Sequence, residues 1–269
     1  MSDSNNKKHA NKETEKRKLS DLTGAFKVQA DSIRQRIQDT LNQRHIDKAL
    51  QHSLDSEGNK KEHVVLVHGL FLHGTYTKVM SHWLRKAGFT TTEFSYRTIQ
   101  ANLDTNAERL YQHFQSIDAE VIHAVGHSLG GVLLQHLYAN FDMQNKGRVV
   151  ALGSPFLGSA VARFLSQNPL ASVMLGKSIA DTNSKKQPEW KSKHELGIIA
   201  GDIPVGLGTV LGKVLEKPND GTVSVTETQL PGYKEHIVLP VAHTALIFSP
   251  KTTEKVVCFL QKGCFDESD

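Results

Sequence analysis

The sequence has little cysteine and no long apolar run. Its 269 residues include two cysteines, Cys258 and Cys264, so a disulfide framework is not expected. No stretch reaches the ~18 consecutive apolar residues of a membrane-spanning helix. The polar start, Met1 to Lys8, does not lead into an apolar core, which argues against a signal peptide. The sequence therefore predicts a cytoplasmic protein.

A strong excess of charge of one sign is also missing. The formal net charge is +4, and lysines and arginines of the first eighteen residues account for much of this surplus. Nucleic-acid binding usually requires a more basic domain or a basic stripe. We therefore expect no nucleic-acid partner.

The common signatures of cofactor and metal sites are absent from the sequence. The glycines of Gly126-x-x-x-Gly130-Gly131 do not have the spacing of a dinucleotide-binding loop, and no P-loop is present. Three histidines lie near one another in the most informative stretches, but their spacing matches no zinc pattern: His68, His73 and His127. The sequence predicts no cofactor and no metal.

Residues 1–58 differ in character from the rest of the chain. Residues 1 to about 19 are polar and predict a disordered tail. From Ser20 to Leu54, apolar residues recur at spacings of three and four, which predicts an amphipathic helix. This helix either packs on the rest of the chain or on a second copy, or lies on an anionic membrane surface as a peripheral contact. The oligomeric state stays open.

Residues 59–269 alternate between strand-like and helix-like patterns. Buried strands are expected at residues 64–67, 89–96, 121–126, 147–152, 195–200 and 235–240. Helices are expected between most of them, one starting at a capping box Thr105-x-x-Glu108 and a final one between Ser249 and Gly263. Such alternation predicts an α/β fold with a mostly parallel central sheet and helices on both faces.

The most informative stretch is residues 121–131. An apolar strand ends in Gly126-His127-Ser128-Leu129-Gly130, and an apolar helix pattern follows at once. A serine at such a sharp strand-to-helix turn exposes its hydroxyl above the N-terminus of the new helix. Glycines on both sides suit the turn because neighbouring chains approach it too closely for a Cβ atom.

Further motifs follow in a fixed order along the chain. They are His68-Gly69-Leu70, the Ser128 turn, Gly153-Ser154-Pro155, Asn219-Asp220-Gly221 and His243-Thr244. With these residues, the chain resembles the α/β-hydrolase family, and in particular its bacterial lipase-like and esterase-like members. The resemblance covers residues 60 to 265. It implies an α/β-hydrolase fold, a catalytic triad in the order Ser-Asp-His, and a possible lid segment at residues 156–194; an ordinary surface helix and loop is the alternative for that segment.

The expected triad consists of Ser128, His243 and Asp220. A serine hydroxyl needs a base, and His243 follows the last strand, where the base should lie. The imidazole in turn needs a carboxylate. Asp220 lies in a strong turn signal, and Asp202, directly after a strand, is the alternative.

Backbone amides should bind the negative charge that develops on the substrate's carbonyl oxygen. The amide of Leu129 directly follows the serine, and the second donor is Leu70, with Phe71 as the alternative. Apolar side chains beside these positions are expected to form the substrate-binding walls: Phe71, Leu72, Phe156 and Leu157.

The predicted function is therefore that of a serine esterase, lipase-like in character. It would cleave carboxylic esters, lipid-like or otherwise acyl, through an acyl-serine intermediate, with a small-molecule acyl ester as its partner. The same residues would serve a thioesterase, an amidase or an acyltransferase. A binding module that keeps the fold without catalysis is the remaining alternative.

Overall fold

The computed structural model describes residues 62–70, 74–167, 175–180, 189–206 and 214–266. The tail and amphipathic helix expected over residues 1–58 lie outside this range. So do Phe71 and Leu72 of the expected substrate-binding walls, and parts of the segment 156–194.

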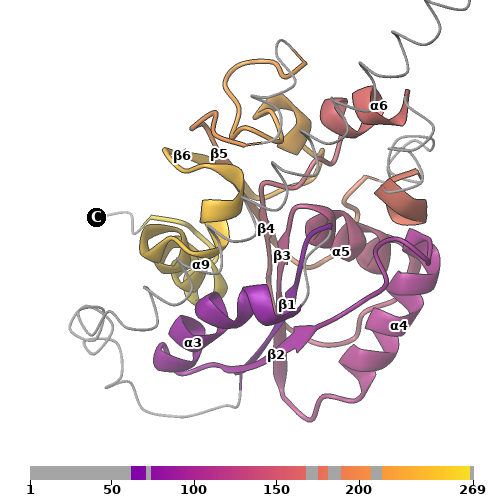
Figure 1. Cartoon of the computed structure of the whole chain (residues 1–269). Helices are drawn as coiled ribbons and strands as arrows, with labels where there is room; N and C mark the ends of the chain where they lie inside the picture. Colours follow the sequence, from indigo (N-terminus) through magenta and orange to yellow (C-terminus); the bar gives the residue numbers. More distant parts are fainter. Residues whose placement is uncertain (1–61, 71–73, 168–174, 181–188, 207–213, 267–269) are drawn as a thin grey trace, which may run out of the picture.

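A six-stranded parallel sheet forms the centre of the described chain (Figure 1). Its spatial order is β2-β1-β3-β4-β5-β6, and every neighbouring pair is parallel. The strands are β1 (Glu62–Val67), β2 (Thr90–Phe94), β3 (Val121–His127), β4 (Val149–Leu152), β5 (Leu196–Gly201) and β6 (Glu235–Leu239). The chain reverses its direction of travel across the sheet after β2, so the carboxyl ends of β1 and β3 lie side by side.

Each central strand is buried on both faces. Along β1, Val65 and Val67 belong to one apolar cluster, whereas Val64 and Leu66 belong to the other. The same alternation separates Ala151 from its neighbours in β4. Since side chains alternate along a strand, a continuous apolar run fits a sheet that is covered on both sides.

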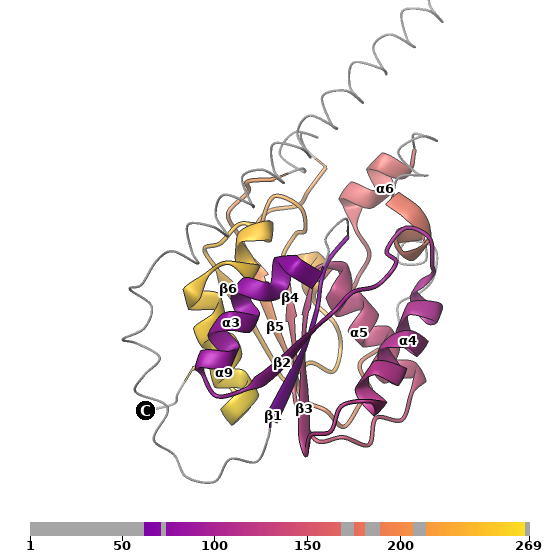
Figure 2. The same ribbon diagram turned by 60° about the horizontal axis from the view of Figure 1, so that its bottom comes forward.

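Helices cover both faces of the sheet, as expected (Figure 2). α3 (Lys78–Lys86) and α9 (Pro250–Lys262) bury their apolar stripes in one cluster, and α4 (Leu103–Gln115) and α5 (Leu129–Asn140) in the other. α5 is apolar almost all round because it packs against the sheet and α4 together. The α/β architecture predicted from the sequence is therefore confirmed.

The start of α4 differs from the expected capping box. The side chain of Asn102 accepts a hydrogen bond from the Thr105 N–H at 2.9 Å, so the helix begins at Leu103 rather than after Thr105. Asparagine is at least as good an N-cap as threonine. Starting three residues earlier also brings Leu103 into the core, where it is fully buried.

Both expected ends of α9 are present. Ser249 accepts from the Thr252 N–H at 3.2 Å, Pro250 is the first helical residue, and Gly263 has the left-handed φ of 78° that ends the helix. Within the described residues, three short 3-10 helices also occur: η3 (Gly74–Thr77), η4 (Thr226–Thr228) and η5 (His243–Ile247). No helix of the described residues is long and apolar enough to cross a membrane.

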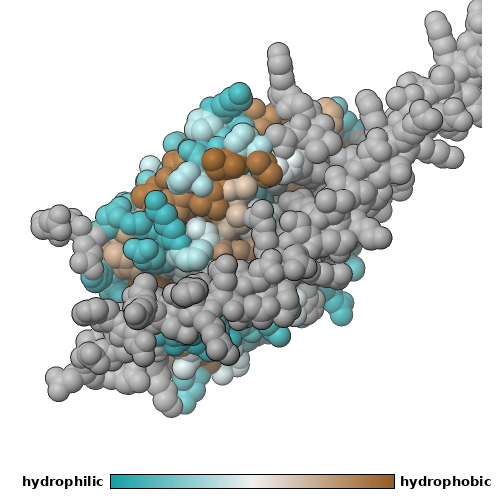
Figure 3. Space-filling model, turned by 60° about the vertical axis from the view of Figure 1, so that its left-hand side comes forward, coloured by the Kyte–Doolittle hydropathy of each residue, from teal (hydrophilic) through white to brown (hydrophobic). Residues whose placement is uncertain are grey.

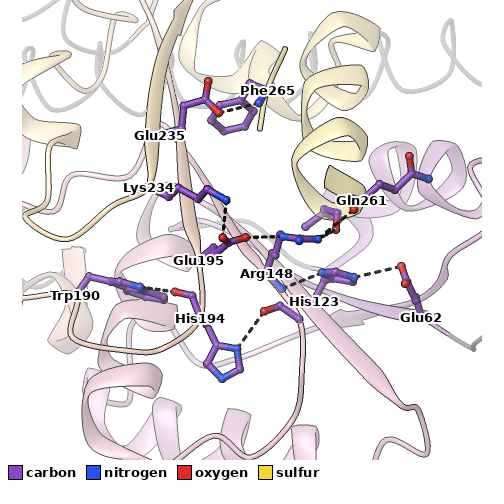
Figure 4. Close-up of polar contacts among 12 residues, drawn as sticks. Glu62, His123, Arg148, Trp190, His194, Glu195, Lys234, Glu235, Gln261 and Phe265 are labelled. Carbon is purple, nitrogen blue, oxygen red and sulfur yellow. Dashed lines mark hydrogen bonds and ion pairs between the residues drawn. The ribbon is translucent and has the colours of Figure 1, made fainter. Parts of the chain in front are cut away.

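Charged residues tie α9 to the amino edge of the sheet (Figure 4). Arg148, just before β4, pairs with Glu195 at 2.7 Å and donates to the Leu260 carbonyl of α9 at 2.7 Å. Lys234, just before β6, pairs with Glu195 at 2.5 Å. A cation beside the last carbonyls of a helix is favourable because these oxygens lack intrahelical partners.

The possible lid segment includes α6 (Ala160–Ser166) and residues 175–180, and the second of these is bonded to the segment after β2. α6 begins directly after Ser159, whose side chain accepts from the Ala162 N–H at 3.1 Å. Residues 175–180 are helical, and Ser178, fully buried, donates to the Ala101 carbonyl at 2.8 Å. The Lys177 N–H donates to the Ile99 carbonyl at 3.0 Å.

A comparison of two glycines tests how much the charged cluster of Arg148, Glu195 and Lys234 contributes to stability. Gly88→Ala and Gly263→Ala should each cost about 1–2 kcal/mol, since both positions have a positive φ that a Cβ atom disfavours. A Cβ at Gly88 meets nothing within 4 Å, whereas one at Gly263 lies 2.7 Å from Glu195 Oε2 and 2.8 Å from Lys234 Nζ. Chemical denaturation should show the larger loss for Gly263→Ala. Equal losses would contradict a stabilising role for the charged cluster.

Candidate active site

Ser128 lies in the turn between β3 and α5 in a strained conformation. Its φ is 55° and its ψ −122°, and it is the one non-glycine residue with a positive φ among those described. A Cβ at Gly126 would lie 2.6 Å from the Gly131 nitrogen, and one at Gly130 would lie 2.2 Å from the Val67 oxygen. Both flanking positions of the motif therefore require glycine, because the turn is pressed against β1 and α5.

The surroundings of Ser128 come from three strand ends. The Ser128 N–H donates to the Leu152 carbonyl at the end of β4, at 2.8 Å. From the other side, Gly69 follows β1 so closely that an added Cβ would lie 3.0 Å from the Ser128 Cβ. The serine is therefore enclosed at the carboxyl edge of the parallel sheet, where ligands bind in open α/β folds.

His243 and Asp220 form a buried pair. His243 Nδ1 lies 2.7 Å from Asp220 Oδ2, and the two residues are 6% and 1% exposed. The His243 N–H also donates to the Asp220 backbone carbonyl at 2.9 Å. The other carboxylate oxygen, Oδ1, accepts from the N–H groups of Thr222 and Val223 at 2.9 and 2.7 Å. These bonds hold the carboxylate so that Oδ2 faces the imidazole.

Gly153 places this pair beside the serine. It follows β4 directly, next to the Leu152 carbonyl that Ser128 contacts. A Cβ added at Gly153 would lie 3.0 Å from Asp220 Oδ2 and 3.1 Å from His243 Nδ1. Ser128, Asp220 and His243 therefore lie around the end of β4.

Asp202, the alternative acid, has no bond to His243 in the structure. Its N–H donates to the Leu239 carbonyl at 3.2 Å, and its buried Oδ1 has no hydrogen-bond partner within the described part of the chain. Both aspartates lie between β5 and β6, Asp202 directly after β5 and Asp220 later in the loop. Of the two aspartates, the structure brings Asp220 to the imidazole.

His127 is a buried neighbour whose place at the site the sequence did not reveal. Its Nε2 lies 3.0 Å from the His243 carbonyl oxygen, and the centroids of the two rings are 4.8 Å apart. Burial lowers the pKa of His127 to about 3, and the nearby His243 adds to this effect. His127 is therefore neutral at pH 7, with Nε2 as the donor to His243. In the sequence, the position of His127 directly before Ser128 was the one feature that could have indicated its place at the site.

The structure describes both residues whose N–H groups were expected to bind the oxyanion, Leu70 and Leu129. Leu129 is the first residue of α5 and is 1% exposed; Leu70 follows Gly69 and is half-buried. Within the described residues, neither N–H donates to a backbone carbonyl. The oxyanion-binding role of these two N–H groups stays a prediction.

The expected walls of the substrate pocket have unlike surroundings. Phe156 is 1% exposed and belongs to the apolar cluster on the α4 and α5 side of the sheet. Leu157 is 54% exposed. Phe71 and Leu72 lie outside the described residues. Phe156 and Leu157 are adjacent in the turn between β4 and α6 but differ in burial.

Glu227 links the Asp220 loop to the segment after β4, a role that no motif in the sequence indicated. It is 7% exposed, and its carboxylate accepts from the Ala160 N–H at 2.5 Å and the Ser224 N–H at 2.8 Å. Its backbone carbonyl accepts from the Leu157 N–H at 3.1 Å. The start of α6 and the acid loop are therefore fixed to each other.

No cluster of three or more metal-ligating side chains occurs among the described residues.

Comparisons with known proteins identify the fold. No protein-family model and no curated protein matches the chain. Lipase BlEst2 from Bacillus licheniformis superposes with a TM-score of 0.57 at 18% identity, covering 76% of this chain and 93% of that one. A metagenomic carboxyl esterase gives 0.56 at 17%, covering 70% and 66%. A bromoperoxidase from Bacillus anthracis gives 0.53 at 14%, covering 77% and 94%.

At these identities, the likeness establishes the fold alone. The chain has the α/β-hydrolase fold, as the motifs in its sequence predicted.

The buried neutral histidines predict how stability depends on pH. The pKa of His127 is lowered to about 3, so the folded state binds fewer protons than the unfolded state between pH 6.5 and 3. This contribution to stability is complete above pH 6.5 and is lost as the pH falls. It has a slope of up to about 1.4 kcal/mol per pH unit. The free energy of unfolding should be measured by chemical denaturation at pH 7.5 and at pH 5. Its decrease between these two pH values should be smaller for His127→Gln than for the wild type. An unchanged difference would contradict the buried, neutral state.

Proposed function

We propose that the protein is a serine esterase that cleaves carboxylic esters with an apolar acyl group. The observation that carries this proposal is the buried His243–Asp220 pair, 2.7 Å apart, beside the strained turn of Ser128. The names of two structurally similar proteins, a lipase and a carboxyl esterase, support it.

In the proposed reaction, Ser128 Oγ attacks the acyl carbon while His243 accepts the serine proton. Asp220 holds Nδ1–H, so that Nε2 is the free base, and it stabilises the imidazolium that forms. The C–O bond to the alcohol then breaks, and the imidazolium gives its proton to the leaving oxygen. A water molecule attacks the acyl-serine in the same way and releases the acid.

The negative charge on the carbonyl oxygen would be bound by the N–H groups of Leu70 and Leu129. Leu70 follows Gly69 and Leu129 precedes Gly130, and at both glycines another part of the backbone or Ser128 lies close. Fixed donors are effective because they need no reorganisation as the charge develops. The N-terminus of α5 adds a favourable dipole at the same point.

Variants of the three residues test this assignment. Ser128→Ala should abolish labelling by a fluorophosphonate probe and hydrolysis of p-nitrophenyl butyrate. Asp220→Asn should lower kcat by about 10⁴-fold, because the amide leaves the imidazole in the wrong tautomer. Asp202→Asn is the matched control and should retain activity near that of the wild type. A large loss in Asp202→Asn with an active Asp220→Asn would overturn the assignment of the acid, and an unlabelled wild type would overturn the function.

Exposed apolar side chains gather at the edge of the sheet that carries the site. Ile99 follows β2, Leu157 and Phe164 follow β4, and Ile203 and Val205 follow β5; they are 37–66% exposed. Figure 3 shows a group of apolar side chains in the upper part of the face that carries β6 and α9. Exposed apolar side chains at this edge of the sheet suit contact with an apolar group of a ligand. They support an apolar acyl group as the substrate's recognised part.

Val205 offers a test of acyl recognition, since it is 66% exposed and its backbone packs against Gly221, next to Asp220. Val205→Ser should lower kcat/KM for p-nitrophenyl decanoate about threefold to tenfold through lost apolar contact, with little change for the acetate. Tyr233→Ser is the control, because Tyr233 is 38% exposed but lies before β6, at the opposite edge. Equal losses for both esters would contradict an acyl-binding role.

A further inference from the structure

The backbone after β1 is held by an imidazole that the proposed reaction does not use. His68 is 1% exposed, and its Nδ1 lies 2.8 Å from the carbonyl oxygen of the next residue, Gly69. Its Nε2 accepts from the Tyr96 N–H at 3.4 Å. One neutral tautomer, protonated at Nδ1, satisfies both bonds, so His68 donates to the Gly69 carbonyl.

Tyr96, which lies in the segment directly after β2, holds His68 in place. The two rings stack with centroids 4.6 Å apart and planes 24° from parallel. The Tyr96 hydroxyl donates to the His68 carbonyl at 2.9 Å. Burial raises the pKa of Tyr96 well above its ordinary value, so the hydroxyl keeps its proton across the working range of pH. Both the side chain and the backbone of His68 are therefore held by one residue.

The bond from His68 determines the direction of the next N–H group. The Gly69 carbonyl and the Leu70 N–H belong to one peptide unit, and in a trans peptide these two groups point in opposite directions. With its carbonyl turned toward His68, the unit turns the Leu70 N–H away from that ring. A Cβ added at Gly69 would lie 3.0 Å from the Ser128 Cβ, so the peptide unit between Gly69 and Leu70 begins next to the serine.

We propose that His68, supported by Tyr96, is a positioning residue that aims the Leu70 N–H at the oxyanion. This inference rests on the proposed function. Without the His68 bond, the peptide unit between Gly69 and Leu70 could rotate, since glycine restricts the backbone least. An oxyanion donor that rotates away stabilises the transition state less but leaves ground-state binding of the ester almost unchanged.

Three variants separate this role from packing. His68→Leu keeps an apolar volume but removes the donor; kcat should fall about tenfold to hundredfold with KM nearly constant. His68→Asn places an amide N–H close to the position of Nδ1 and should recover most of the activity. Tyr96→Phe keeps the stacked ring, removes the hydroxyl, and should lower kcat by a smaller factor.

The control is His123→Leu. His123 is also a buried histidine, 2% exposed, with a pKa lowered to about 4, mainly by burial. It accepts from the Arg148 N–H at 2.9 Å near the amino edge of the sheet, away from the site (Figure 4). His123→Leu should change stability without changing kcat.

Binding of n-butylboronic acid gives the decisive readout, because its adduct with a serine places an oxygen where the oxyanion forms. In His68→Leu, its inhibition constant should rise by about the same factor as kcat/KM falls. A fall in kcat/KM without weaker boronate binding would overturn the positioning role, as would full activity of His68→Leu. If the wild type neither hydrolyses esters nor binds the boronate, the proposed function fails, and this inference fails with it.

Discussion

The close approach of backbones around the Ser128 turn is the constraint on which the site depends. The turn holds a serine at φ 55°, and β1, β4 and α5 press against it where a Cβ would not fit, at Gly126, Gly130 and Gly69. A strained conformation persists only where its surroundings over-determine it. Here the surroundings are the ends of parallel strands buried on both faces, so the stability of the sheet maintains the geometry of the site.

The polar residues of the molecule divide between the two edges of the sheet. At the amino edge, Arg148, Glu195 and Lys234 form ion pairs that hold α9 in place. At the carboxyl edge, buried carboxylates are each held by several hydrogen bonds, as in Asp220 beside His243 and in Glu227. Partly exposed ion pairs tolerate exchange with water, whereas buried polar groups must be satisfied by fixed partners. The second arrangement suits a site that requires precise geometry.

The segment after β4 connects the Ser128 site to the exposed apolar side chains around it. Glu227 ties the start of α6 to the loop of Asp220, and Ser178 ties residues 175–180 to the chain after β2. The exposed apolar side chains of this region therefore rest on a framework that is bonded to the acid loop.

The sequence by itself determined the class of fold and the order of its elements. The strand at residues 121–127, the glycines around Ser128 and the capping of α9 by Ser249 and Gly263 depend on local periodicity, turn chemistry and helix ends, which short segments encode. The start of α4 was wrong, because two good N-caps lie three residues apart and only the burial of Leu103 separates them.

Only the tertiary structure decided which distant residues meet. The local turn signal favoured Asp220 over Asp202, but it could not show which carboxylate reaches the imidazole. The bond to His243 depends on how the loop between β5 and β6 folds back. The same holds for His127 beside His243, Tyr96 around His68, and Glu227 beneath α6. These contacts join residues from different strands, and their positions depend on the packing of the whole sheet rather than on any one segment.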